Sequence, residues 1–189
     1  MTRRYPFALI KERLAERGDK AIDFAMGRRS IPLPENIATW VRSNWDLALQ
    51  SANRADMEAF AEAAASYMAR EYKVEISSDH VLPTVGGRVA MTAFIACVLK
   101  SDDPVLVTEP GYPAFARLAQ HRHARVITVP LDPDNAFAPR LSEVPAAGEF
   151  RVISVNYPNN PTGAKLSRAV IANLGELASS DTVLFNDAT

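Results

Sequence analysis

The sequence predicts an α/β fold in which a mainly parallel sheet is covered by helices. Short runs rich in Val, Ile and Leu recur through the second half of the 189 residues, and segments with helical periodicity separate them. Strands that are apolar throughout, without alternating polar positions, are typical of parallel sheets buried on both faces. A chain of this length also buries a sizeable core without disulfide bonds.

The first part of the chain is predicted to be mainly helical. Residues 1–20 form an amphipathic pattern whose apolar stretch is too short for a signal peptide. A strand-like piece is expected at 22–25 and a helix from about Glu35. A further helix is expected over 57–73, with Asp56 as its N-cap.

The rest of the chain repeats a strand followed by a helix. The expected strands cover about 80–82, 103–110, 124–131, 150–157 and 182–187. The helices expected between them cover 88–100, 114–122 and 167–178. No apolar run approaches the roughly 18 residues that a membrane span needs.

Composition excludes several classes of protein. The net charge is −1 with both signs scattered, so no electrostatic footprint for nucleic acid is present. Cys97 is the single cysteine, which rules out an internal disulfide, and its apolar surroundings "AMTAFIACVL" predict a buried, inert thiol. We therefore expect a cytoplasmic protein without a metal site and without nucleic-acid or membrane partners.

Chemically distinctive residues follow the strands, where open α/β sheets bind ligands. "TVGGR" at 84–88 opens a helix; two glycines there suit a phosphate cradle, although an ordinary turn has the same composition. Tyr112 in "EPGYP" is placed either to lie on a planar ring or to pack on the edge of the core. Asp187 is placed either to pair with a protonated ring nitrogen or to cap a helix.

The segment "NYPNNPTG" at 156–163 is the most specific signal. Pro161 forces Asn160 away from helical backbone, and Pro158 does the same to Tyr157. Asn160 is therefore expected to be held extended with its amide aimed at a fixed point. A rigid turn explains the prolines, but not why they frame an amide.

These segments resemble the class I/II aminotransferases, which are pyridoxal 5′-phosphate (PLP) enzymes of the aspartate aminotransferase fold. "VLPTVGGRVAM", "SDDPVLVTEPGYPAFARLAQHRHARVITVPLD", "NYPNNPTG" and "TVLFNDAT" occur in the family order, and the resemblance runs from about Asp23 onward. It implies the large PLP-binding domain of that fold, incomplete in this chain. Residues 1–45 would form an N-terminal arm and part of the small domain, and 46–189 the first part of the large domain.

The resemblance also implies roles for individual residues. Asn160 is expected to hydrogen-bond the phenolic oxygen of PLP and to help seat the substrate carboxylate. Tyr112 is expected to stack on the pyridine ring, and Asp187 to keep the ring nitrogen protonated. The phosphate would be bound by the backbone N–H groups of Gly86, Gly87 and Arg88.

The substrate side is expected near the N-terminus. Gly27 is similar to a family glycine whose backbone faces the substrate carboxylate. Arg28 and Arg29 follow it and are candidates to meet a side-chain carboxylate, or are simply solvated. Around Ser51 the chain lacks the family tyrosine that reaches the phosphate of the neighbouring subunit, which leaves that cross-subunit contact open.

The sequence ends at Thr189, whereas the family's Schiff-base lysine and carboxylate-binding arginine come later. None of the lysines present has the matching sequence context: Lys11, Lys20, Lys73, Lys100 and Lys165. The strand at 80–82 would also lack the late strands that flank it in the family. The rest of the enzyme is therefore expected from a longer polypeptide, from a second chain, or to be lost in a decayed gene.

The predicted function is that of a PLP-dependent aminotransferase, which moves an amino group from an amino acid to a 2-oxo acid, as a homodimer. The 189 residues alone are expected to be inactive. Two alternatives stay open. One is another PLP reaction on the same fold, such as elimination, decarboxylation or an oxygen-using reaction; the other is a non-catalytic aminotransferase-like domain that serves binding or dimerisation.

Overall fold

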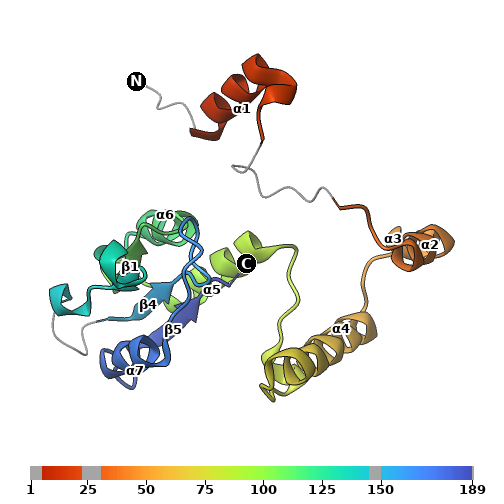
Figure 1. Cartoon of the computed structure of the whole chain (residues 1–189). Coiled ribbons are helices and arrows are strands. Elements are labelled where there is room, and N and C mark those ends of the chain that lie inside the picture. Colours follow the sequence, from red (N-terminus) through yellow and green to blue (C-terminus); the bar gives the residue numbers. More distant parts are fainter. Residues whose placement is uncertain (1–5, 23–30, 145–149, 189) are drawn as a thin grey trace. The chain divides into compact units, whose positions relative to one another are not determined.

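The chain divides into two compact units, residues 1–59 and residues 60–189 (Figure 1). The computed structural model describes residues 6–22, 31–144 and 150–188. The second unit holds the sheet and the strand-following segments that were predicted to bind a ligand. No helix in the described ranges is long and apolar enough to cross a membrane.

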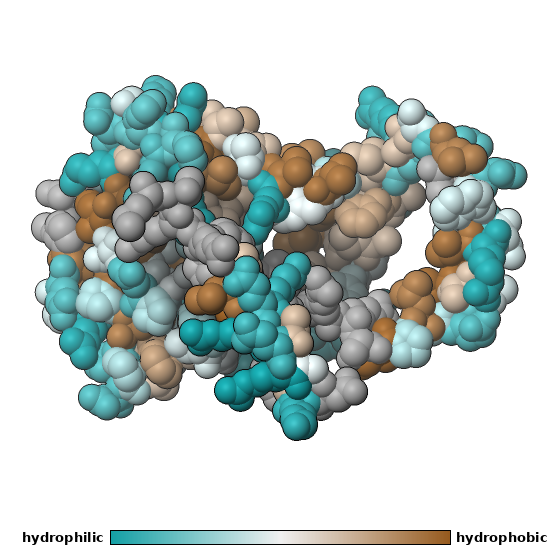
Figure 2. Space-filling view, turned by 90° about the horizontal axis from the view of Figure 1, so that it is seen from above, coloured by the Kyte–Doolittle hydropathy of each residue, from teal (hydrophilic) through white to brown (hydrophobic). Residues whose placement is uncertain are grey.

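The first unit is helical, as predicted. It contains α1 (Pro6–Arg17), α2 (Glu35–Ser43) and α3 (Trp45–Ala48). No residue of α2 is buried, and its Ile37, Trp40 and Val41 are exposed. Figure 2 shows hydrophobic residues, drawn brown, at the surface of the molecule. The strand-like piece expected at 22–25 lies almost wholly outside the described residues, and Ile22 itself belongs to no strand.

The helix predicted over 57–73 begins earlier, because α4 covers Arg54–Tyr67. Asn53 rather than Asp56 precedes the helix as its cap. The Asn53 side-chain oxygen accepts a hydrogen bond from the Asp56 N–H at 3.1 Å, and the Asp56 carboxylate accepts from the Asn53 N–H at 2.9 Å. This reciprocal pair satisfies two N–H groups that the first turn leaves unpaired, so Asp56 acts from the third helical position.

Four parallel strands and one short antiparallel strand form the sheet, in the order β3-β2-β1-β4-β5. The parallel strands are β1 (Pro104–Glu109), β2 (Arg125–Asp132), β4 (Val152–Val155) and β5 (Val183–Asn186). The antiparallel strand is β3 (Ala138–Pro139), on the outer edge of β2. The predicted mainly parallel sheet is confirmed.

Helices cover both faces of this sheet (Figure 1). Val105 and Val107 of β1 face α5 (Gly87–Val98) and α6 (Ala114–His121) in one apolar cluster. Leu106, between them in sequence, packs with the residues of α7 (Arg168–Glu176) in the other. Successive strand side chains point to opposite faces, so a continuous apolar run fills both clusters.

The strand expected at about 80–82 is wrong. Ser78–His80 form a short 3-10 turn, and Val81 after it is extended, with φ −109° and ψ 117°. Extended backbone becomes a strand only when a neighbouring strand pairs with its N–H and C=O groups. No described strand lies beside this segment. Its β-propensity therefore does not lead to a strand.

The prediction of a buried Cys97 is also wrong, because the thiol is exposed. Met91 and Ile95, four residues apart, form the buried stripe of α5. Cys97 is two residues beyond Ile95, which places it about 200° around the helix from that stripe. An apolar sequence on both faces of a helix therefore does not tell which face meets the core.

Candidate active site

Four segments of the second unit meet around one cavity of about 330 Å³. It is lined by Gly87, Arg88, Met91, Tyr112, Asn160 and Asp187. These residues come from the start of α5 and from the segments that follow β1, β4 and β5. All of them except Met91 were predicted from the sequence, and Gly86 directly precedes the group.

The start of α5 supplies backbone N–H groups to this cavity. Gly86 has φ +90°, a conformation that side chains rarely adopt, and its C=O accepts from the N–H groups of Val89 and Ala90. Gly87 is the first helical residue, where N–H groups have no partner within the helix. A Cβ built on Gly86 or Gly87 meets nothing within 4 Å, so a ligand has open access to this backbone.

Tyr112 is held at the cavity by both backbone and side-chain contacts. It follows β1 through Gly111, where an added Cβ would lie 2.6 Å from the backbone oxygen of Thr108. Only glycine therefore fits this turn without a shift in the backbone. The Tyr112 hydroxyl accepts a hydrogen bond from Arg88 Nη2 at 2.8 Å. The sequence had assigned only the backbone of Arg88, so this side-chain role was missed.

The three asparagines of "NYPNNPTG" have different contacts and different exposures. Asn159 is 3% exposed and holds the turn together. Its side-chain oxygen accepts from the N–H of Thr162 at 3.1 Å and from the hydroxyl of Thr162 at 2.7 Å. Its Nδ2 donates to the Pro110 carbonyl at 3.2 Å, which ties this turn to the loop that carries Tyr112.

Asn160 is the asparagine left for a ligand. It is exposed and lines the cavity, and its side-chain amide bonds to no other residue in the described part of the chain. The peptide bonds before Pro158 and Pro161 are cis. Asn160, whose amide was predicted to be presented to a ligand, is thus the exposed asparagine of this turn.

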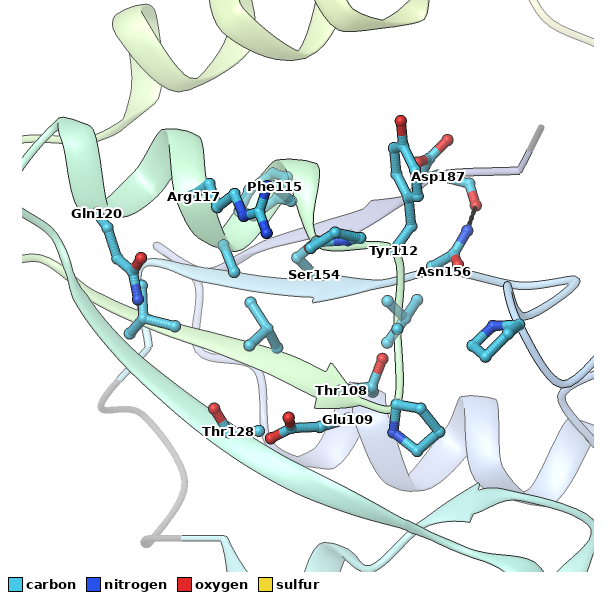
Figure 3. Close-up of a pocket in the computed structure, with 18 residues that line it drawn as sticks. Thr108, Glu109, Tyr112, Phe115, Arg117, Gln120, Thr128, Ser154, Asn156 and Asp187 are labelled. Atoms are coloured by element: carbon cyan, nitrogen blue, oxygen red, sulfur yellow. Dashed lines mark hydrogen bonds between the residues drawn. The ribbon is translucent and has the colours of Figure 1, made fainter. Parts of the chain in front are cut away.

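Asp187 lies one residue beyond β5 and is half-buried. Its N–H donates to the Val155 carbonyl at 3.0 Å, and its own carbonyl accepts from Nδ2 of Asn156 at 2.7 Å (Figure 3). Both of its backbone groups are thereby fixed, and the residue lines the cavity.

A second cavity of about 470 Å³ shares Tyr112 and Asp187 with the first (Figure 3). Its polar lining includes Glu109, Arg117 and Ser154. The two cavities thus adjoin at the residues predicted to hold the ring of a cofactor.

No other predicted residue is placed at this cavity by the described part of the chain. Gly27, Arg28 and Arg29 lie outside the described residues, and Ser51 is exposed in the first unit. None of the lysines of the second unit, Lys73, Lys100 and Lys165, lines either cavity. In the described ranges, no three His, Cys, Asp or Glu residues are grouped closely enough to hold a metal ion.

The sequence of residues 48–189 matches the family Aminotransferase class I and II. The chain belongs to this aminotransferase family. The matched range includes every strand of the sheet and every residue that lines the cavity described above.

Curated aminotransferases resemble the chain over most of its length. An LL-diaminopimelate aminotransferase of Desulforudis audaxviator is 30% identical over 182 residues, which cover 92% of this chain and 46% of that protein. The L-glutamine–4-(methylsulfanyl)-2-oxobutanoate aminotransferase of Bacillus subtilis is 29% identical over 164 residues, which cover 82% of this chain and 40% of that protein. This aminotransferase chain thus spans about half the length of the curated relatives it matches.

Solved structures of aminotransferases share its fold. The substrate-bound structure of BacF from Bacillus subtilis matches with a TM-score of 0.80 at 26% identity, over 97% of this chain and 49% of that one. Aspartate aminotransferase of Thermus thermophilus matches with a TM-score of 0.79 at 23% identity, over 95% and 49% of the two chains. The predicted PLP-dependent transferase fold, present here in part, is therefore confirmed.

Proposed function

We propose that this chain builds one wall of a PLP site in an enzyme that moves an amino group from an amino acid to a 2-oxo acid. The observation that carries the proposal is the single cavity at the start of α5. There a helix N-terminus, an aromatic ring, an open amide and a carboxylate from four separate segments meet. The membership of the chain in the aminotransferase family supports this reading of the cavity.

The residues present fit each part of PLP. Its phosphate is an anion, which suits the positive dipole end of α5 at Gly87 and Arg88. The predicted contribution of the Gly86 N–H is wrong, because this group donates to the Thr84 carbonyl at 2.9 Å. Its planar ring suits the Tyr112 side chain, its phenolic oxygen the Asn160 amide, and its ring nitrogen the Asp187 carboxylate. A cavity of about 330 Å³ also lies in the range of small-molecule sites, about 300–1,000 Å³.

When bound, PLP draws electrons away from the α-carbon of the substrate. The Asp187 carboxylate would hold a proton on the ring nitrogen, which keeps that electron demand high. The Asn160 amide would donate to the phenolic oxygen and help seat the substrate carboxylate. The Tyr112 ring, held by the hydrogen bond from Arg88, would cover the ring and exclude water from one side.

A lysine amine is also needed to hold the cofactor and to move a proton at the α-carbon. Because no lysine of the second unit lines the cavity, and none of the five lysines has the sequence context of the family's Schiff-base lysine, we infer that this amine comes from outside residues 1–189. Gly27 stays a proposed contact for the substrate carboxylate. A homodimer in the cytoplasm is proposed on the same basis, from the resemblance to the family.

The half-reaction of the complete gene product tests this proposal. Purified protein loaded with PLP is mixed with single amino acids in the absence of any 2-oxo acid. Transamination should convert the bound cofactor to pyridoxamine phosphate and release one 2-oxo acid for each site, as measured by absorbance and mass spectrometry. Amino acid consumption that leaves the cofactor as PLP would instead point to elimination or decarboxylation.

A further inference from the structure

Asn156 joins the two residues that are proposed to meet the phenolic oxygen and the ring nitrogen of the cofactor. Its Nδ2 donates to the Asp187 carbonyl at 2.7 Å, as Figure 3 shows, and its Oδ1 accepts from the Asn160 N–H at 2.9 Å. We propose that Asn156 is a positioning residue that sets the spacing between the Asn160 amide and the Asp187 carboxylate. This inference rests on the proposed PLP site.

Asn156 lies directly after β4, at the point where the pairing of β4 with β5 ends. Strands β4 and β5 pair in parallel as far as Val155, which lies opposite Asn186. Beyond this pair, the two segments that follow the strands no longer pair as a sheet. The N–H of Asp187 still bonds to the Val155 carbonyl, but no further ladder bond is available beyond it. Beyond this bond, the Asn156 side chain links the segment after β4 to the segment after β5 through its hydrogen bonds to Asn160 and Asp187.

Burial makes the link selective for an amide. Asn156 is 7% exposed, so its side chain has little access to water as an alternative partner. The amide offers one acceptor and one donor group, and the Asn160 N–H and the Asp187 carbonyl require one of each. A change that removes either group leaves a partly buried backbone group unpaired, which is more costly than losing an exposed hydrogen bond.

Asn186 provides a matched control, because it makes the same kind of link between the same two strand ends. Its Nδ2 donates to the Tyr157 carbonyl at 3.0 Å, and its Oδ1 accepts from the Tyr157 N–H at 2.9 Å. It contacts neither Asn160 nor the carbonyl of Asp187 through these bonds. A purely structural clamp would therefore respond alike to Asn156→Ala and Asn186→Ala.

The first measurement needs no cofactor. In the complete gene product, hydrogen exchange at single-residue resolution should show faster exchange of the Asn160 N–H in Asn156→Ala. In Asn186→Ala the Tyr157 N–H should be the one that exchanges faster. Asn156→Asp keeps the shape and the acceptor, so it should retain protection of Asn160; this variant also covers the case in which Asn156→Ala fails to fold.

The second measurement is the binding of PLP, followed by absorbance and fluorescence titration at about pH 8, where an Asp carboxylate is ionised. Both Asn156 variants should bind PLP roughly tenfold more weakly than wild type. They should also shift the pH midpoint of the cofactor's absorbance change, because the contacts of Asn160 and Asp187 tune the ring. Asn186→Ala should change this midpoint far less.

The outcomes separate the two proposals. Wild-type protein that binds no PLP would overturn the proposed function and the positioning role with it. Wild-type binding together with an unchanged affinity and absorbance midpoint in Asn156→Ala and Asn156→Asp would overturn the positioning role alone. Equal effects of Asn156→Ala and Asn186→Ala on the absorbance midpoint would also overturn it, since they would show a general clamp between strands.

Discussion

At the scale of single residues, the asparagine-rich turn shows how neighbouring side chains of one type take different roles. Asn156 and Asn159 are buried and make their side-chain hydrogen bonds to other groups of the protein, whereas Asn160 is exposed at the cavity. The difference follows from burial, because a buried amide must find partners within the protein. Only the amide that stays open is available to bind a ligand.

Replacing the carboxylate at the cavity tests its assignment. In the complete gene product, Asp187→Ala should leave PLP bound but lower the turnover number by several orders of magnitude, because the ring nitrogen then loses its proton. Steady-state kinetics and cofactor absorbance measure the two effects. Asp181→Ala, at an exposed position, serves as the control. Turnover of Asp187→Ala at the wild-type rate would show that the assignment is wrong.

Tyr157 gives a prediction for the dependence of stability on pH. Burial raises the pKa of its phenol from 10.0 to about 12, and its hydroxyl donates to the Phe137 carbonyl at 2.8 Å. Between pH 10 and 12 the unfolded chain loses this proton first, so its contribution to stability is complete below pH 10 and is lost toward pH 12.

The test compares wild type with Tyr157→Phe by urea unfolding across that pH range. The free energy of unfolding should fall with pH more steeply in wild type than in the variant, which has no phenol to ionise. Parallel curves for the two proteins would contradict the proposed burial effect. The comparison removes the contributions of all other groups that ionise in the same range.

At the scale of elements, the site depends on where strands and helices start and end. The segments after β1, β4 and β5 and the start of α5 each contribute to one cavity because parallel strands place their carboxyl ends together. The connections also restrict which residue types fit, because Gly86 has a positive φ and Gly111 has no room for a side chain.

Two glycine substitutions should change stability in opposite directions. Gly111→Ala places its Cβ 2.6 Å from the Thr108 carbonyl oxygen and should lower the free energy of unfolding by about 1–3 kcal/mol. Gly175→Ala lies inside α7, where an added Cβ meets nothing within 4 Å, and should raise it by about 0.5–1 kcal/mol. Denaturant unfolding measures both; equal stability of the two variants would contradict the geometry of the Tyr112 loop.

At the scale of the whole molecule, the chain carries part of a sheet that ends in an open apolar edge. Strand β5 pairs only with β4 among the described strands, and its Leu184 is 51% exposed. Ile171 of α7, which lines the apolar pocket beside β5 with Leu184, is 53% exposed. Open edges with apolar side chains recruit strands from other chains.

Residues 1–189 produced alone should therefore associate, and they should not acquire PLP on one specific lysine. Light scattering after gel filtration measures the first effect, and borohydride fixation followed by peptide mass spectrometry measures the second. Adding the remaining part of a complete gene product should restore a monodisperse species and the yellow cofactor. A monomeric 189-residue protein with a single pyridoxyl-lysine would overturn the site as described.

The sequence by itself determined the class of fold, the order of its strands and helices along the chain, and most of the residues around the cavity. These features are local, because apolar runs, glycine pairs and proline-framed amides act through the backbone of their own segment. The same local information led to the predictions that Cys97 is buried and that 80–82 form a strand, and both are wrong. Burial and strand pairing depend on which other segments pack beside a residue, and the local sequence does not contain that information.

Only the tertiary structure decided which polar side chains act together. The bond from Arg88 to the Tyr112 hydroxyl joins residues 24 positions apart, and the bond from Asn156 to Asp187 joins residues 31 apart. Such pairs have no spacing that a sequence pattern reveals, because the distance between them is set by how strands lie in the sheet. Most residues that line the cavity could thus be predicted from the sequence, whereas the residues that hold them in place could not.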